Sequence, residues 1–114
     1  MPRMPIDLLQ GSLDLIVLKT LSWQPMHGFG IARWIRQLTG DELQVEEGSL
    51  YPALYRMENR GWIKARWALT ENGRRAKYYD LTAAGRRQLA NESRTWARFA
   101  GVMGKILSAK QQPA

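Results

Sequence analysis

The sequence contains no cysteine and a single histidine, His27, among its 114 residues. Disulfide bonds, thiolate zinc sites and thiol redox sensing are therefore excluded, and so is a histidine-rich metal site. Long apolar runs are also missing, because the longest one, Leu15 to Leu18, is far shorter than the roughly 20 residues of a membrane span. No basic stretch followed by an apolar one marks a secretion leader. We expect a cytoplasmic protein with no metal, no cofactor and no membrane partner.

Catalytic constellations are lacking as well. No nucleophile, second histidine or pair of carboxylates accompanies His27 in the sequence, so an enzyme is disfavoured. His27 directly precedes a helical pattern that opens with Gly28 and Gly30. We expect this histidine to have a structural role at the start of that helix.

Acidic residues are scarce relative to basic ones. Seventeen Lys and Arg residues against ten Asp and Glu residues give a formal charge of +7 and a sequence pI near 10.3. Nine of the basic residues and only three acidic ones lie between Lys64 and Arg98. Such an excess indicates a polyanionic partner. The hydrophobic fraction of 45% and the five tryptophans predict an ordered core, and the length fits one domain.

The spacing of apolar residues predicts two helices in the first part of the chain. Apolar positions three or four residues apart run from Leu9 to Leu21, and Pro25 stops this pattern; they are Leu9, Leu13, Ile16, Val17, Thr20 and Leu21. A second helix is predicted from Gly28 to Gly40, with an inner face formed by Ile31, Trp34, Ile35 and Leu38.

A third helix is predicted from about Ser49 to Arg60. Gly48 or Ser49 can serve as its N-cap, and Pro52 falls in the first turn, where a missing N–H costs little. Its core-facing residues are Leu50, Leu54 and Met57, and Gly61 ends it. Glu46 and Glu47 favour its N-terminal end electrostatically or point away from any phosphate.

The second part of the chain predicts a hairpin followed by a long helix. Residues 62–67 and 76–81 both alternate with period two, and Asn72-Gly73 between them favours a tight reversal. Thr82 is the expected N-cap of a helix that runs towards Ala109. This helix carries an apolar seam with heptad spacing, formed by Leu89, Trp96, Phe99, Met103 and Ile106. We expect residues 1–7 and 110–114 to be flexible ends.

The order helix, helix, helix, hairpin, long helix is typical of a winged helix-turn-helix domain. The predicted fold class is therefore mainly α, with three helices and a two-stranded wing over residues 8–81 and a C-terminal dimerisation helix over residues 82–109. In helix-turn-helix proteins the second helix of the motif lies in the major groove of DNA. Here that element is the third predicted helix.

The outward residues near the start of this helix form the candidate reading set: Ser49, Tyr51, Pro52, Tyr55 and Arg56. Helix N-termini favour anions, and the longer side chains can reach base edges or the backbone. The alternative for Tyr51 and Tyr55 is ordinary surface or core packing.

The hairpin contributes the candidate phosphate contacts, which are Lys64, Arg66, Arg74, Arg75 and Lys77. Three cations within four positions at the tip suit a wing that follows phosphates or enters a narrow minor groove. The alternative is a solvated charged turn. For the seam of the last helix, Trp96 is either interface packing or a stacking wall for an aromatic effector.

Several stretches of the chain resemble the PadR family of bacterial transcriptional regulators. They are residues 26–31 (MHGFGI), 45–54 (VEEGSLYPAL), Glu58, 61–63 (GWI) and 74–85 (RRAKYYDLTAAG), and the resemblance covers about Leu8 to Leu89. The combination of GSLYPxL with the later KYYxLTxxG is specific. Phe29 stands where tyrosine is usual in the family, a change that removes one hydroxyl.

The resemblance implies a homodimeric repressor that binds a pseudo-palindromic operator in double-stranded DNA. It also implies that the C-terminal helix pairs with its mate and with the first helix of the partner subunit. Family members often release DNA when a small, flat or apolar molecule binds near the dimer interface. The single helix after the hairpin places the chain with the short members of the family. The rival hypothesis is a winged-helix protein-interaction module that does not bind DNA.

Overall fold

The computed structural model describes residues 6–111, and the side chains of residues 12–111. It contains α1 (Ile6–Leu21), β1 (Met26–His27), α2 (Gly28–Leu38), α3 (Glu47–Asn59), β2 (Ile63–Leu69), β3 (Arg75–Leu81) and α4 (Ala83–Leu107). The first helix begins earlier than predicted, at Ile6, and the side chain of Leu9 lies outside the described ones. The predicted flexible ends also lie outside the described residues, except for 6–7 in α1 and 110–111.

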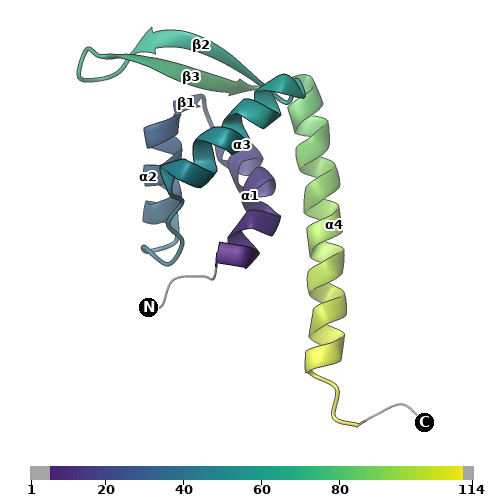
Figure 1. The fold of residues 1–114 in the computed structure, drawn as a ribbon. Helices are drawn as coiled ribbons and strands as arrows, with labels where there is room; N and C mark the ends of the chain where they lie inside the picture. Colours follow the sequence, from purple (N-terminus) through teal and green to yellow (C-terminus); the bar gives the residue numbers. More distant parts are fainter. Residues whose placement is uncertain (1–5, 112–114) are drawn as a thin grey trace.

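Three helices form the body of the molecule, with the hairpin above them and α4 along one side (Figure 1). The core consists of apolar side chains from α1, α2, α3 and the sheet, and it includes Val17, Ile31, Leu50, Leu54, Met57, Ile63 and Tyr79. The predicted inner face of α3 is confirmed, and so is that of α1 from Leu13 to Leu21. On α2 the prediction was wrong for Leu38, which is 68% exposed because it is the last residue of the helix and lies beyond the core.

The sheet has three antiparallel strands in the order β1-β3-β2, and not the two that the sequence predicted. Met26 and His27 pair with Tyr79 and Tyr78, so the chain enters α2 directly from the sheet. A two-residue strand is too short to show a period-two pattern, which explains why sequence reasoning missed it. The extra strand attaches the start of α2 to the base of the hairpin.

His27 has the structural role expected of it. Its Nδ1 accepts a hydrogen bond from the Gly30 N–H at 2.9 Å and so caps the N-terminus of α2. Its ring also lies edge-on to Tyr78, with 5.1 Å between the ring centroids. The histidine therefore joins the second helix to the hairpin.

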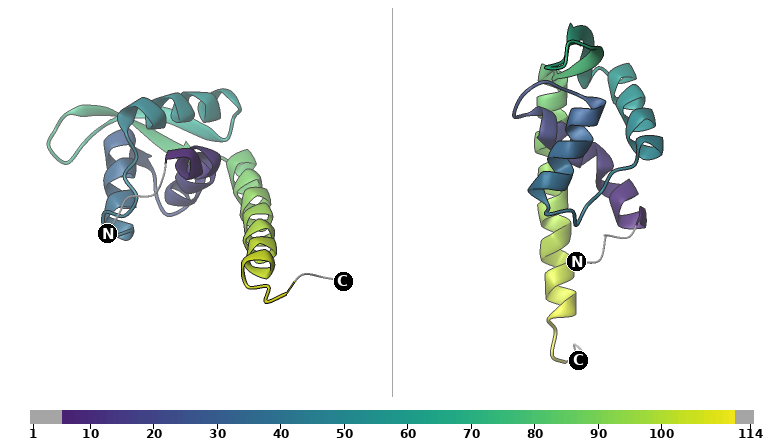
Figure 2. Two further views of the ribbon diagram at one scale, coloured as in Figure 1. Left: turned by 60° about the horizontal axis from the view of Figure 1, so that its bottom comes forward. Right: turned by 90° about the vertical axis from the view of Figure 1, so that its left-hand side faces the viewer.

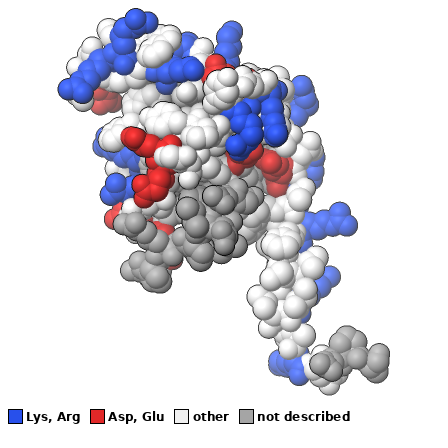
Figure 3. Space-filling model, in the orientation of Figure 1, with Lys and Arg blue, Asp and Glu red and all other residues white. Residues whose placement is uncertain are grey.

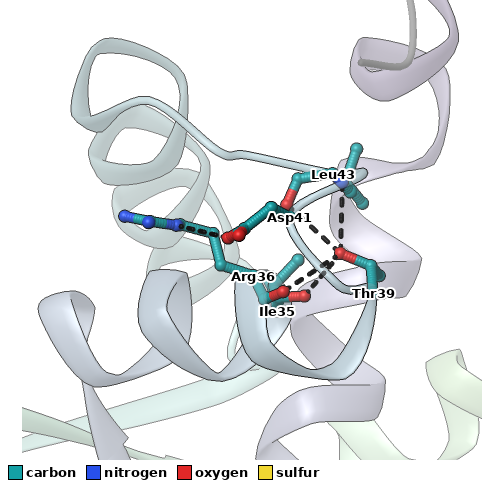
Figure 4. Close-up of polar contacts among 5 residues, drawn as sticks. All are labelled: Ile35, Arg36, Thr39, Asp41 and Leu43. Atoms are coloured by element: carbon teal, nitrogen blue, oxygen red, sulfur yellow. Dashed lines mark hydrogen bonds and ion pairs between the residues drawn. The ribbon is translucent and has the colours of Figure 1, made fainter. Parts of the chain in front are cut away.

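A hydrogen-bonded turn connects α2 to α3 (Figure 4). The Thr39 hydroxyl donates to the Ile35 carbonyl at 2.9 Å and accepts from the Leu43 N–H at 3.1 Å. Asp41 has a left-handed backbone with φ 65° and pairs with Arg36 at 3.3 Å. This turn directs the chain into α3, which begins one residue after Glu46. The predicted N-cap at Gly48 or Ser49 was wrong, because the Ser49 N–H already bonds the Glu46 carbonyl.

The last helix is fixed at its first turn and then leaves the body of the molecule. Thr82 caps it as predicted, because its hydroxyl accepts from the Gly85 N–H at 3.0 Å. A Cβ atom on Gly85 would lie 2.0 Å from the Trp62 carbonyl oxygen, so only glycine permits this close approach. The distal half of α4 extends past the other helices (Figure 2). None of the helices in the described part of the chain combines the length and apolar character of a membrane span.

Candidate nucleic-acid interface

The N-terminal half of α3 presents an exposed surface that faces away from the core. Tyr51 is 44% exposed, Tyr55 is 67% exposed, and Pro52 lies between them. The Tyr51 ring is placed against the start of α2, where a Cβ atom on Gly28 would lie 2.7 Å from the tyrosine Cε1 and Oη atoms. The absence of a side chain at position 28 therefore determines where this tyrosine lies.

The other two predicted reading residues lie on a different side of α3. Ser49 is half-buried, and Arg56 forms an ion pair with Asp14 of α1. Both precede Arg60 at helical spacing, on the side of α3 that turns towards α1 and α4. The helix thus divides its outward residues between two surfaces. Tyr51 and Tyr55 form the tyrosine surface, and Pro52, three residues before Tyr55 and four before Arg56, lies at the edge between the two.

The hairpin also has two faces, because successive strand residues point to opposite sides. One face carries Trp67 and Leu69 on β2 opposite Lys77 and Arg75 on β3, in line with the buried Ile63 and Tyr79. The other face carries Lys64 and Arg66 opposite Asp80 and Tyr78. The five predicted phosphate contacts are therefore not on one surface.

Lys77 connects the hairpin to α3. Its Nζ atom lies 3.2 Å from the Glu58 Oε1 atom, and both side chains are about one third exposed. The hydrogen bond that Lys77 donates to Glu58 raises the pKa of Lys77, and this effect outweighs the opposing effect of burial. Burial raises the pKa of the neighbouring Tyr79, whose hydroxyl therefore stays protonated. At neutral pH this side of the hairpin keeps one ammonium group that is partly neutralised by a carboxylate.

On the opposite face, Arg66 forms an ion pair with Asp80 at 2.8 Å and its guanidinium lies 5.6 Å from the Tyr78 ring centroid. Lys64 and Arg74 are exposed and have no ion-pair partner among the described residues. Lys and Arg side chains gather over the end of the hairpin in the space-filling view (Figure 3). The end of the hairpin is therefore the more available cationic surface.

A groove runs between α3, the start of α2 and the hairpin face that carries Trp67 and Lys77. It has a volume of about 490 Å³ and is lined mainly by aromatic side chains. These are His27, Phe29, Tyr51, Tyr55, Trp67 and Tyr79, together with Gly28, Glu58, Ala76 and Lys77. The groove brings residues from three separate stretches of the sequence together.

Trp67 is one of the groove residues that were not among the predicted site residues. It is 61% exposed, and the Arg75 guanidinium lies 5.2 Å from its ring centroid. The period-two pattern places it on the same face as Ile63, which suggests a buried position. The signal that was available is the basic tip, which begins at Arg74, seven residues further on, since the strand extends beyond the core there.

The distal half of α4 exposes a row of apolar side chains. Trp96 is 50% exposed, Phe99 60% and Ile106 62%, and Met103 is half-buried. Leu89 was predicted to belong to the same surface. It packs against the core of its own chain instead, because the N-terminal part of α4 lies beside α1. The predicted seam is therefore available for contacts only from Trp96 onwards.

Comparisons with known proteins agree on one family. The model of the transcriptional regulator PadR-like family matches residues 17–91. An uncharacterized protein from Lysinibacillus sphaericus is 30% identical over 91 residues, which cover 80% of this chain and 84% of that protein.

Solved structures give the same result. A transcriptional regulator from Clostridium thermocellum has a TM-score of 0.80 and 29% identity, over 87% of this chain and 96% of that one. A PadR family transcription regulator from Clostridium difficile has a TM-score of 0.75 and 30% identity, over 86% of this chain and all of that one.

Proposed function

The chain belongs to the PadR-like family of transcriptional regulators, and we propose that it is a homodimeric repressor that binds a pseudo-palindromic DNA operator. It is a winged-helix DNA-binding regulator and not an enzyme. In the proposal, α3 lies in the major groove and the hairpin contacts the neighbouring backbone or minor groove. A small apolar or aromatic molecule releases the DNA.

The observation that carries the proposal is the position of Tyr51 and Tyr55 beside the groove that leads to the cationic hairpin. Base contacts in helix-turn-helix proteins come from the N-terminal part of the reading helix, where these tyrosines are exposed. We assign Tyr51, Pro52 and Tyr55 to the major groove, and Ser49 to the backbone at the same helix end. Arg56 would have to break its ion pair with Asp14 before it reached DNA, so it contributes least.

The proposed phosphate contacts fall into two groups. Arg74, Arg75 and Lys77 lie at or near the hairpin end and act together with α3. Lys64 and Arg66 lie on the opposite face, where Arg66 is already paired with Asp80. We therefore expect these two residues to contribute to DNA affinity through long-range electrostatic attraction and not through direct contacts. With about 6–10 phosphates neutralised by the dimer, affinity falls steeply as salt concentration rises.

We propose that a second copy of the chain packs against the apolar row on α4. Trp96, Phe99, Met103 and Ile106 repeat with heptad spacing, as in paired helices. Two-fold pairing through α4 would hold two α3 helices about 34–36 Å apart, one turn of DNA. An effector that bound against Trp96 would change this spacing.

Selection of bound fragments from random duplex DNA tests the proposal directly. We expect two half-sites with two-fold symmetry, and a strong decrease of affinity with salt. Arg74→Ala/Arg75→Ala should weaken binding to all duplexes. A winged-helix module that does not bind DNA would select no sequence, and the double substitution would cause no loss of DNA affinity. Trp96→Lys/Phe99→Lys should give monomers in sedimentation, and an unchanged dimer would place the interface elsewhere.

A further inference from the structure

The face of the hairpin that looks towards α3 has exposed apolar side chains that the fold does not use. Trp67 is 61% exposed and Leu69 is 66% exposed, and both lie on β2, an edge strand of the sheet. Exposed apolar residues on an edge strand favour unwanted strand pairing and are normally covered. Their presence on this strand therefore indicates a partner.

The charges around these side chains select the kind of partner. Arg75 lies opposite Leu69 across the hairpin and its guanidinium stands over the Trp67 ring, 5.2 Å from the centroid. Lys77 lies opposite Trp67, and Arg74 precedes Arg75 in the loop. A second copy of the same surface would bring these cations together and be repelled. A polyanion would be attracted.

Trp67 also restricts the position of Arg75. An arginine on an exposed strand samples many rotamers, and ordering such a side chain costs conformational entropy. A guanidinium stacked on an indole is held in advance, so less of this cost remains when it meets a phosphate. The adjoining groove, lined by Tyr55, Lys77 and Tyr79, continues this surface to the reading helix.

We propose that on this hairpin face Trp67 positions Arg75 against the sugar–phosphate backbone that flanks the site read by α3. The inference rests on the proposed DNA-binding function and deepens it. Trp67 is a positioning residue, and Leu69 covers the apolar edge of a deoxyribose. The face, rather than the loop tip alone, holds the flanking DNA.

The test compares Trp67→Leu, Trp67→Phe and a matched control, Trp23→Leu. Trp23 is 64% exposed and has the Lys19 ammonium 4.9 Å from its ring centroid, but it lies in the link between α1 and β1. The control thus removes the same chemistry from another surface. The probes are the duplex obtained by selection and the same duplex shortened at both flanks, with affinities measured by fluorescence anisotropy.

We expect Trp67→Leu to weaken binding to the full duplex by about three- to tenfold, as loss of a cation–π contact and its ordering effect predicts. Trp67→Phe, which keeps an aromatic ring under Arg75, should stay within about twofold. Trp23→Leu should bind like the unchanged chain. On the shortened duplex, Trp67→Leu and the unchanged chain should bind equally, because the flanking contact is no longer there.

A double-mutant cycle separates positioning from independent contact. If Trp67 acts through Arg75, then Trp67→Leu/Arg75→Gln binds no more weakly than Arg75→Gln alone. Full additivity overturns the positioning role, and equal binding by Trp67→Leu and Trp23→Leu overturns the surface itself. If the unchanged chain selects no duplex, the proposed function fails first. A thermal midpoint for Trp67→Leu near that of the unchanged chain shows that folding is not the cause of its loss.

Discussion

Replacing Glu92 with leucine tests how the last helix is packed. Glu92 stands at a seam position of α4, seven residues before Phe99, where an apolar residue is expected. It lines a groove between α1 and α4 together with Asp14 and Trp96. Its Oε2 atom is buried and has no hydrogen-bond partner in the part of the chain that the structure describes. Burial raises the pKa of this carboxyl group; a hydrogen bond with Gln88 opposes this shift, and the charge of the neighbouring Asp14 adds to it.

The magnitude follows from the unpartnered oxygen atom. A buried acceptor without a hydrogen bond costs about 1–3 kcal/mol, so Glu92→Leu should raise the free energy of unfolding at neutral pH by about this amount. For a domain near this size, about 1 kcal/mol moves the thermal midpoint by about 4–8 °C.

The sign of the pH dependence follows from the raised pKa. A raised pKa means that the folded chain holds the Glu92 proton more tightly than the unfolded chain does. The stability that this proton supplies is complete below the unfolded pKa and is lost as pH rises through the folded pKa. Glu92→Leu has no such proton. The stability difference between the variant and the unchanged chain should therefore be small in acid and grow towards neutral pH.

Urea unfolding followed by tryptophan fluorescence, from about pH 4 to about pH 8, measures this difference. The protomer concentration must be constant, because the stability of a dimer depends on it. Glu92→Gln should lose the pH dependence, and Glu71→Leu, at an exposed position in the hairpin loop, should show no gain that grows with pH. The reasoning would be refuted if Glu92→Leu were less stable than the unchanged chain at neutral pH. It would also be refuted if the difference in unfolding free energy between the two were the same at every pH.

Three further substitutions test the contacts that orient α3 and α4. Gly85→Ala should lower the free energy of unfolding by about 3 kcal/mol or more, because its Cβ atom would meet the Trp62 carbonyl; a thermal midpoint close to that of the unchanged chain would contradict the packing. Thr82→Ala removes the cap of α4 and should cost about 0.5–2 kcal/mol in urea unfolding, with no loss expected only if another group caps the helix. Gly28→Ala should displace the Tyr51 ring and weaken binding to the selected duplex by about five- to tenfold, as loss of one base contact predicts. The circular dichroism spectrum should show an intact fold. Undiminished affinity would remove Tyr51 from the reading set.

Most of the helical architecture was predictable from local patterns. The periodic apolar residues of α1 and α3, the cap at Thr82 and the turn around Gly73 each depend on neighbours within a few positions. Propensity, capping and amphipathic spacing act over this range, so the sequence alone carries the signal. The family resemblance depends on motifs of the same local kind.

The arrangement of the candidate site was less predictable. Arg56 and Arg66 read as free cations in the sequence, but each has a carboxylate partner that is distant along the chain, Asp14 and Asp80 respectively. The N-cap of α3 is Glu46, whose side chain makes no capping hydrogen bond and so carries none of the usual signal. Trp67 follows the pattern of a buried strand residue and is exposed because the hairpin extends beyond the core.

The sequence by itself determined the four helices, the two long strands and much of the core, and that a basic hairpin follows the exposed half of the helix from Glu47 to Asn59. Only the tertiary structure decided which cations are neutralised, which tyrosine rests on Gly28, and which hairpin face meets the groove beside α3. The physical reason is the range of the interactions. Helix and strand formation depends on nearby residues, whereas an ion pair or a stacked ring depends on side chains that come together only after the chain has folded.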